Sequence, residues 1–301
     1  VIPPWYVFYE ANLRQPKVPL GAAYCARAAM SAGWHATIWN GDLLPEGGEN
    51  QYSEEMTSYG SYLVNQSRPD NPIWGEYRAI LREVQPDVVG ITALTASYPT
   101  SLTCARIAKE ELPHCIVVIG SPHPNAVPTQ VIKDSPYVDV AVTGEGELTL
   151  IEILNRVVTS QPENTPYSLL PTPYLDGIPG TVTRHTVAPP RTFVPELDQL
   201  GWPTKGRCAD PHGLLKRDNF GLVMFSRGCP YYCEFCASPE LWTRKVRWRS
   251  AKDMAAEMLS IHREYDTRYF SFEDDTFTLN KKRTIELMQA IIETGLPTVP
   301  G

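Results

Sequence analysis

The sequence has no excess of basic residues, no internal repeat and no low-complexity tract. Lys and Arg number 27 against 34 Asp and Glu, which gives a net charge of −7 at pH 7. Because such a chain has no positive excess to neutralise a phosphate backbone, we expect no nucleic-acid partner. The hydrophobic runs, such as Ile116–Ile119, are strand-length and far short of the ~18 residues of a membrane helix. No basic segment followed by an apolar one marks a signal peptide, so we expect a cytoplasmic protein with no membrane span.

The residues that are present are typical of a folded protein. The chain has 301 residues, of which 43% are hydrophobic and 20% are charged. At ~100–200 residues per domain, this length predicts two domains or one large one. Seven cysteines are present, and three of them fall within eight residues. In a cytoplasmic protein such a cluster favours a metal site over a disulfide framework.

Short apolar runs alternate with helical patterns in the first half of the chain. Asn71 followed by Pro72 is a typical helix start, whereas residues 41–70 are rich in Gly, Glu, Ser and Asn and predict an irregular insertion. Strands without polar alternation, separated by helices, indicate a parallel sheet that is buried on both faces. Residues 1–159 therefore predict a doubly wound, Rossmann-like α/β domain. Its expected strands are 6–9, 36–39, 88–91, 116–119 and 138–142, and its expected helices are 20–33, 72–84, 102–112 and 150–158.

Two further regions follow this domain. Residues 160–220 hold ten of the 28 prolines and show little periodicity, which predicts a connector over the protein surface. Residues 221–301 predict the order strand, helix, strand, helix, and the two strands are expected at 222–225 and 269–272. Polar residues suited to capping precede both helices: Ser250 with Asp253, and Asn280.

A cysteine motif of spacing C-x3-C-x2-C follows the strand expected at 222–225. Its members are Cys229, Cys233 and Cys236. Three thiolates on one short loop can ligate three irons of a [4Fe–4S] cluster, which leaves the fourth iron open to a small molecule. The sequence leaves two alternatives: a structural zinc site with Cys208 or His212 as fourth ligand, and buried thiols without a metal.

The cysteine loop begins Ser-Arg-Gly-Cys, contains Tyr232 and Phe235, and resembles the radical S-adenosylmethionine superfamily. The resemblance implies that the open iron chelates the amino and carboxylate groups of S-adenosylmethionine. One electron then splits the S–C5′ bond and yields a 5′-deoxyadenosyl radical. The resemblance also implies that Phe235, which precedes the last cysteine, packs by the cluster and helps to hold the adenine.

Two charged segments fit the same resemblance. Glu273, Asp274 and Asp275 end the strand expected at 269–272, where a family motif binds the amino group of S-adenosylmethionine. We expect one of these carboxylates to bind it, and a helix-capping acid run is the alternative. The second segment resembles the basic stretch that follows the cluster in one branch of the family: Arg244, Arg247 and Arg249, then Ser250. A solvated charged face is the alternative for this stretch.

A doubly wound domain before such a loop resembles the cobalamin-dependent branch of the superfamily. Five segments have the order and spacing of that branch: Pro19–Gly21, Pro86–Thr92, Gly120–His123, Gly144–Glu147, and Glu196–Asp198 with Pro203. Ligands of open α/β sheets bind outside the carboxyl ends of the strands, where glycines let a bulky group approach the backbone. For residues 144–147, a tight turn with a helix N-terminus is the alternative. The candidate cobalamin-binding residues are Thr92, Thr95, Ser97, Gly120, Ser121, His123, Gly144 and Glu145.

Two features depart from the wider family pattern. The motif D-x-H-x-x-G, whose His coordinates cobalt in many cobalamin-binding domains, is absent from the sequence. We therefore expect no His-ligated cobalt, and we expect His35, His114 and His123 to be ordinary surface or turn residues. The barrel of the superfamily has about six strand–helix units, whereas residues 221–301 supply about two, which cannot close a barrel. We expect the chain to be the front part of a longer enzyme.

The resemblance implies an enzyme with a [4Fe–4S] cluster, S-adenosylmethionine and cobalamin as cofactors. Its expected reaction is methylation of an unactivated carbon, in which the adenosyl radical abstracts hydrogen and methylcobalamin supplies the methyl group. Ring formation, oxidation or rearrangement is an alternative, and the acidic balance argues against tRNA modification. A non-catalytic corrinoid-binding module with a structural zinc is an alternative of another class. The expected partners are a small-molecule or peptide substrate and a flavodoxin or ferredoxin electron donor.

Overall fold

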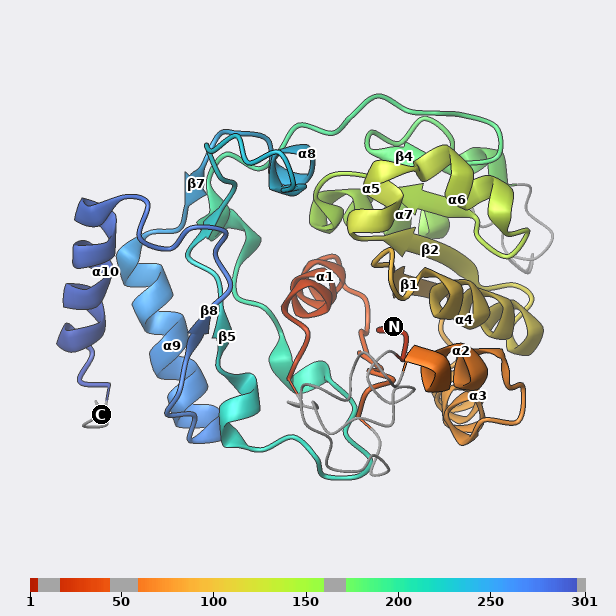
Figure 1. The fold of residues 1–301 in the computed structure, drawn as a ribbon, viewed down its shortest axis with the longest axis horizontal. Coiled ribbons are helices and arrows are strands. Elements are labelled where there is room, and N and C mark those ends of the chain that lie inside the picture. Colours follow the sequence, from red (N-terminus) through yellow and green to blue (C-terminus); the bar gives the residue numbers. More distant parts are fainter. Residues whose placement is uncertain (5–16, 44–58, 160–171, 297–301) are drawn as a thin grey trace.

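The computed structural model describes residues 1–4, 17–43, 59–159 and 172–296. Figure 1 shows two α/β parts side by side, with helix α1 (Leu20–Ser31) between them. The strand expected at residues 6–9 lies outside the described residues. In the part of the chain that is described, no helix is both long enough and apolar enough to cross a membrane.

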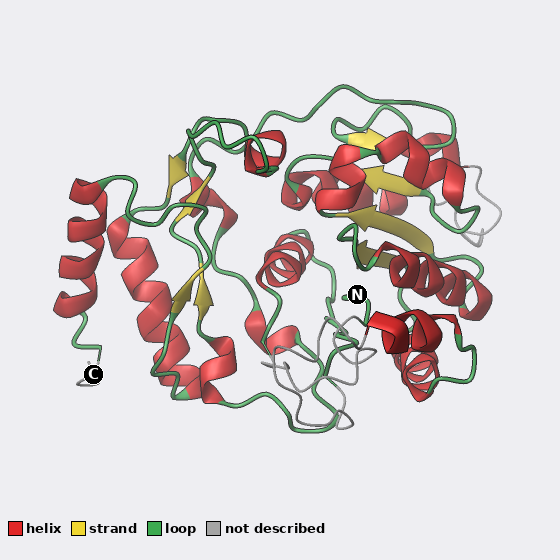
Figure 2. Ribbon diagram, viewed as in Figure 1, coloured by secondary structure: helices red, strands yellow, loops and turns green. Residues whose placement is uncertain are grey.

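The first part is built on a sheet of strand order β1-β2-β3-β4 (Figure 2). Strands β1 and β2 are parallel, with Val88 opposite Ile116 and Thr92 opposite Gly120. Strand β3 runs parallel to β2, and β4 is antiparallel to β3. The strands are β1 (Val88–Thr92), β2 (Ile116–Gly120), β3 (Val140–Val142) and β4 (Thr181–Val182). Because β4 comes from the proline-rich segment, that segment completes the sheet as well as crossing the surface.

Helices cover both faces of this sheet, as the buried strand sequences require. Helix α3 begins where expected, because the Asn71 side chain accepts a hydrogen bond from the backbone of Ile73 at 3.2 Å. One apolar core lies beneath α3 and α4, and a second lies beneath α7. The doubly wound α/β fold class is confirmed. The helices are α2 (Tyr59–Ser67), α3 (Pro72–Val84), α4 (Tyr98–Glu111), α5 (Pro122–Ala126), α6 (Pro128–Asp134) and α7 (Gly146–Thr159).

Two local expectations are wrong. Residues 36–39 form isolated bridges and no strand, because the backbone of Ile38 is bonded to Arg207 and Ala209 of the proline-rich segment. Part of the region expected to be irregular, residues 41–70, forms helix α2. The backbone partners of Ile38 are distant in the sequence, and local composition does not reveal them.

The second part contains the expected strand, helix, strand and helix in that order, with two further short strands and a short helix between the first strand and the first expected helix. Its strands form two short pairs: β5 (Leu222–Val223) parallel to β8 (Ser271–Phe272), and β6 (Ser226–Arg227) antiparallel to β7 (Arg247–Trp248). Its helices are α8 (Ser238–Trp242), α9 (Ala251–Tyr265) and α10 (Lys281–Glu293). Single turns of 3-10 helix lie in the proline-rich segment: η4 (Thr172–Leu175), η5 (Leu197–Leu200), η6 (Lys205–Arg207) and η7 (Arg217–Phe220).

Helices α9 and α10 pack together over a small apolar core that contains Phe225 and Met254. Both helices begin at the caps that the sequence predicts. The Ser250 hydroxyl accepts from Asp253 N at 3.2 Å, and the Asn280 side chain accepts from Arg283 N at 3.1 Å.

Candidate functional site at the junction of the two parts

The cysteine loop emerges from strand β6 at a position that requires glycine. Gly228 has φ +101°, and a Cβ there would lie 2.8 Å from the carbonyl oxygen of Lys245. Cys229 is nearly buried, and its Sγ lies 3.5 Å from the hydroxyl of Thr276. Cys233 and Cys236 are exposed, with Cys236 N donating to the carbonyl of Cys233 at 3.1 Å. The loop therefore offers one sheltered and two open thiols.

Within the described residues, no three Cys, His, Asp or Glu side chains are close enough to share one metal ion. The donors considered as a fourth zinc ligand have other surroundings. Cys208 packs against the cluster of Val18 and Ile38, and His212 lies 2.8 Å from the carboxylate of Glu76. A [4Fe–4S] cluster does not need thiols that meet at one ion, because each thiolate takes a different iron. The donor set therefore fits an iron–sulfur cluster better than a single zinc ion.

Aromatic side chains of the loop face outward. Phe235, the residue matched to the cluster-side aromatic, is 92% exposed, and Tyr232 is also exposed. The Arg244 guanidinium lies 3.4 Å from the centre of the Tyr232 ring and donates to the carbonyl of Tyr231. An exposed phenyl ring beside two exposed thiols leaves a surface for a bound molecule or for further parts of the protein.

The acidic triplet after β8 divides into two kinds of residue. Asp274 accepts hydrogen bonds from Phe225 N at 3.0 Å and from both the backbone and hydroxyl of Ser226 at 2.5 Å. Burial raises the pKa of Asp274, against the lowering effect of these hydrogen bonds. Glu273 and Asp275 are exposed, and each accepts from a single serine hydroxyl, Ser271 and Ser238 respectively. Asp274 thus holds the backbone before the cysteine loop, and its two neighbours face solvent.

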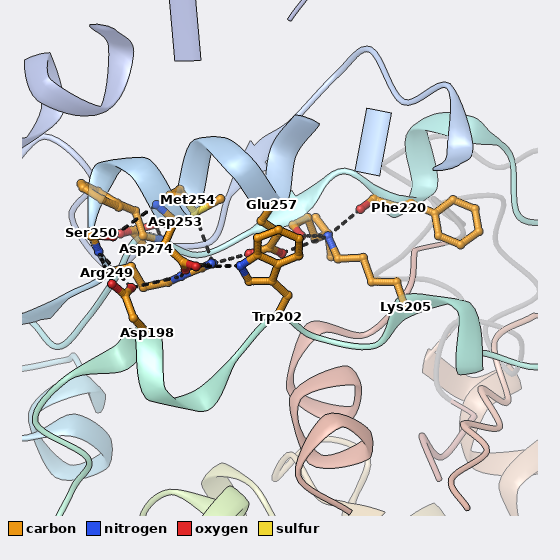
Figure 3. Close-up of polar contacts among 12 residues, drawn as sticks. Asp198, Trp202, Lys205, Phe220, Arg249, Ser250, Asp253, Met254, Glu257 and Asp274 are labelled. Atoms are coloured by element: carbon orange, nitrogen blue, oxygen red, sulfur yellow. Dashed lines mark hydrogen bonds and ion pairs between the residues drawn. The ribbon is translucent and has the colours of Figure 1, made fainter. Parts of the chain in front are cut away.

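In the basic stretch, the arginines that follow Arg244 are buried and do not form a solvated face. Arg249 is 2% exposed and pairs with Glu257 and Asp253 of α9, the latter at 2.5 Å. Figure 3 shows Glu257 between Arg249 and the ammonium of Lys205, which lies 3.9 Å from it. Lys205 also donates to the carbonyls of Phe220 and Leu222, and burial lowers its pKa to about 8. This network fastens the proline-rich segment to α9.

A second buried network joins the two parts of the molecule. Arg227 pairs with Glu145 at 2.6 Å and with Glu147 at 2.7 Å, and Arg247 pairs with Glu145 at 2.9 Å. The local alternative for residues 144–147 is also seen, because Gly144 has φ +72° and α7 begins at Gly146. Sequence reasoning missed this network, since its partners are about 80 to 100 residues apart and the only signal was an acidic pair beside a buried strand.

The carboxyl edge of the sheet in the first part approaches the cysteine-bearing segment, since α5, which follows β2, contacts α8, which follows the cysteines. At this edge Thr95 and the ring of His123 are 3.1 Å apart, and that ring lies over Tyr98. Burial lowers the pKa of His123. Ser97 is buried, and its carbonyl accepts from the hydroxyls of two α4 residues, Thr100 and Ser101.

A cavity of about 1090 Å³ extends from this edge between α1, α3 and β1. Its walls are mainly apolar. Of the candidate cobalamin-binding residues, Thr92, Gly120, Ser121, Gly144 and Glu145 line it, whereas Thr95, Ser97 and His123 do not. The cavity is also bordered by residues of the second part, Arg227, Trp242 and Glu273.

The cavity wall includes the hydroxyl-bearing residues Thr92 and Ser121 as well as its apolar side chains. The periphery of a corrinoid carries amide side chains, and hydroxyl groups beside a mainly apolar wall fit such a ligand.

Family comparisons agree with this arrangement. Residues 66–154 match the B12 binding domain, and residues 223–299 match the radical SAM superfamily. The chain therefore belongs to the radical S-adenosylmethionine superfamily, in the branch that carries a cobalamin-binding domain. The resemblance inferred from the cysteine loop and the preceding domain is confirmed.

Individual relatives place the chain more closely. It is 35% identical over 219 residues to an uncharacterized methyltransferase of Pyrococcus horikoshii, covering 72% of this chain and 46% of that protein. It is 30% identical over 219 residues to the anaerobic magnesium-protoporphyrin IX monomethyl ester cyclase of Cereibacter sphaeroides, covering 72% of this chain and 35% of that protein. Thus the chain matches less than half the length of each of these relatives.

The fold is also that of a solved enzyme. The structure of the radical S-adenosylmethionine methyltransferase TsrM from Kitasatospora setae, with tryptophan substrate and a SAM analogue bound, matches with a TM-score of 0.62. The match covers 93% of this chain and 49% of that one at 16% identity. At this identity the likeness supports the order and packing of the two parts.

Proposed function

We propose that the full-length enzyme is a cobalamin-dependent radical S-adenosylmethionine methyltransferase that methylates an unactivated carbon. One observation carries the proposal. The carboxyl edge of the sheet in the first part and strand β6, which leads into the cysteine loop, line one cavity, through Gly120, Gly144 and Arg227. A methyl carrier and a radical initiator must act on one substrate, so their binding regions have to adjoin. The domains proposed are 1–159 for cobalamin, 160–220 for the connector, and 221–301 for the start of the barrel.

Cys229, Cys233 and Cys236 would hold the [4Fe–4S] cluster. When bound, the cluster supplies the electron that cleaves S-adenosylmethionine, and cobalamin carries the methyl group. The exposed carboxylates of Glu273 and Asp275 are available to bind the ammonium group of S-adenosylmethionine.

The loop's other residues would position the same ligand. Phe235 would cover the adenine side, and its exposure leaves its face free to do so. Asp274 contributes indirectly, because its three hydrogen bonds hold the backbone at Phe225 and Ser226, just before the cysteines.

Cobalamin would lie at the carboxyl edge of the sheet and reach into the cavity. Thr92 and Ser121 can donate hydrogen bonds from its rim, and Gly120 and Gly144 let the ligand approach the backbone. Thr95, Ser97 and His123 lie beside this rim and would contact the outer part of the ligand.

The partners proposed follow from the chemistry. A flavodoxin or ferredoxin would supply the low-potential electron, and the substrate would be a small molecule or a peptide, with no nucleic acid involved. A cytoplasmic location is proposed because cluster-ligating thiols have to stay reduced.

Radical cyclisation is the second candidate, because the relatives of this chain include anaerobic magnesium-protoporphyrin IX monomethyl ester cyclases, one of them 30% identical. The two candidates differ in the fate of the methyl group of S-adenosylmethionine. A methyltransferase moves an isotopically labelled methyl group into product, whereas a cyclase forms 5′-deoxyadenosine with no label in product.

The proposal is tested by the composition of anaerobically purified protein. We expect about four iron and about four sulfide per chain, and a shifted visible spectrum when hydroxocobalamin is titrated in. Cys233→Ala should lose most of the iron and keep cobalamin binding, while Cys208→Ala, a thiol outside the motif, should keep both. One zinc per chain without iron would contradict the proposal and favour the non-catalytic module.

A further inference from the structure

Four buried charges lie where the two parts of the molecule meet. Glu145 and Glu147 lie at the start of α7, directly after strand β3 of the first part. Arg227 and Arg247 belong to β6 and β7, which pair with each other and place these two residues opposite one another. All four side chains are at most 8% exposed. The carboxylates thus come from one part and the guanidinium groups from the other.

The strands β6 and β7 are the two ends of the segment that carries the cysteines. Arg227 precedes Cys229 by two residues, and Arg247 follows the loop on the returning strand. Glu145 receives hydrogen bonds from both arginines, at 2.6 and 2.9 Å. A single carboxylate of the first part, that of Glu145, therefore binds both ends of the cysteine-bearing segment.

Aromatic rings and backbone groups complete the junction. The Arg227 guanidinium lies 5.0 Å from the Tyr24 ring of α1 and 5.3 Å from the Trp242 ring of α8. Arg247 lies 4.8 Å from the Phe193 ring and donates to the carbonyl of Val194 at 2.8 Å. These contacts fix the orientation of each guanidinium group, in addition to the ion pairs that compensate its charge, and the junction is therefore rigid.

Charge balance shows why these residues act as a unit. Burial alone raises the pKa of Glu145, but the hydrogen bonds and charges of Arg247 and Arg227 outweigh it and lower that pKa. The buried guanidinium of Arg227 is paired with both carboxylates, Glu145 at 2.6 Å and Glu147 at 2.7 Å. Two carboxylates and two guanidiniums cancel, and removing one partner leaves a buried charge uncompensated.

We propose that Glu145, Glu147, Arg227 and Arg247 form an ion-pair lock that positions the cysteine loop against the cobalamin-type domain. The Gly-Glu-Gly-Glu segment then has a docking role through its carboxylates, in place of a role as a cobalamin ligand for Glu145. The proposal rests on the proposed function for its purpose, since it fixes the separation of the two cofactor sites. These four are positioning residues.

The test uses the full-length enzyme with both cofactors loaded, and the variants Glu145→Gln and Glu147→Gln. Glu111→Gln is the matched control, because Glu111 also binds two arginines, Arg78 and Arg82, but within the α3–α4 pair. Hydrogen exchange is measured in peptides covering 144–150 and 222–229. Pulsed EPR measures the distance distribution between cob(II)alamin and the reduced cluster.

We expect at least a tenfold rise in exchange at both peptides in Glu145→Gln, a smaller rise in Glu147→Gln, and a broadened distance distribution with unchanged iron and cobalamin content. Glu111→Gln should match the wild type in both readouts. Unchanged exchange and an unchanged distance distribution in the two lock variants would overturn the proposal. If Glu145→Gln does not fold, the exchange and distance data of Glu147→Gln decide whether the proposal holds. This variant is milder, because Glu147 has one arginine partner where Glu145 has two. A wild type that binds neither cofactor refutes the proposed function, while the exchange data still decide on the lock.

Discussion

Glu257 is the residue whose replacement should cost most in the second part of the molecule. Its carboxylate lies between Arg249 and Lys205, and all three side chains are at most 3% exposed (Figure 3). Glu257→Gln removes the charge and keeps nearly the same shape. The variant leaves Lys205 without a carboxylate within 4 Å among the described residues, although Arg249 retains Asp253.

The expected cost follows from this partial loss of partners. Breaking a buried ion pair by removing one member costs roughly 3–5 kcal/mol, because a buried charge is left uncompensated. Since Asp253 still neutralises Arg249 and the amide can accept a hydrogen bond, we expect the low end, about 3 kcal/mol. At about 1.4 kcal/mol per factor of ten, α9 should exchange its amides roughly a hundredfold faster.

The assay is hydrogen exchange in peptides covering α9, residues 251–265, compared with those of β2 in the other part. The matched control is Glu286→Gln, which breaks the exposed pair of Glu286 with Lys282 on α10 and should cost less than about 1 kcal/mol. Protection of α9 in Glu257→Gln within a factor of three of wild type would refute the reasoning about burial. A loss of protection equal to that of Glu286→Gln would do the same.

Two further predictions concern the same part of the molecule. Burial lowers the pKa of Lys205 from 10.5 to about 8 in the folded protein, so the unfolded chain binds more protons between these two values and the wild type gains stability as pH rises through them. Relative to Lys205→Met, the free energy of unfolding of the wild type in urea should rise by about 3 kcal/mol from pH 7 to pH 10.5. A difference between the two proteins that does not change with pH would contradict the assignment. Gly228→Ala should destabilise the protein by more than about 2 kcal/mol and lower its iron content, because residue 228 has a positive φ and the added Cβ would collide with the backbone of Lys245. The control is Gly213→Ala, at a residue that also has a positive φ but has open space around it. This variant should cost about 1 kcal/mol and leave the iron content unchanged.

The sequence predicted correctly the helix starts and strands that depend on residues close together in the chain. The caps at Asn71, Ser250 and Asn280 were predicted correctly because a side chain near in sequence satisfies each helix N-terminus. The strands β1 and β2 were found because their residues are apolar without alternation. The superfamily was found through the resemblance of the cysteine loop, with its Ser-Arg-Gly start and its aromatic residues Tyr232 and Phe235.

Partners distant in sequence account for what was missed. Residues 36–39 have strand-forming residues, yet Ile38 bonds to a segment about 170 residues away and forms only a bridge. The buried pairs of Glu145 were not predicted, because its arginine partners lie in the other part of the chain. A single sequence carries no information on which acid pairs with which base at that distance, so the junction could be seen only in the structure.

The central claim is that three cysteines hold an iron–sulfur cluster with one iron open to S-adenosylmethionine. The most direct measurement is the EPR spectrum of the reduced full-length enzyme, recorded anaerobically before and after addition of S-adenosylmethionine. The account predicts a [4Fe–4S]⁺ signal whose g values shift when the ligand is added, and loss of that signal in Cys233→Ala. A cluster signal unchanged by S-adenosylmethionine, or one that persists in Cys233→Ala, would contradict it.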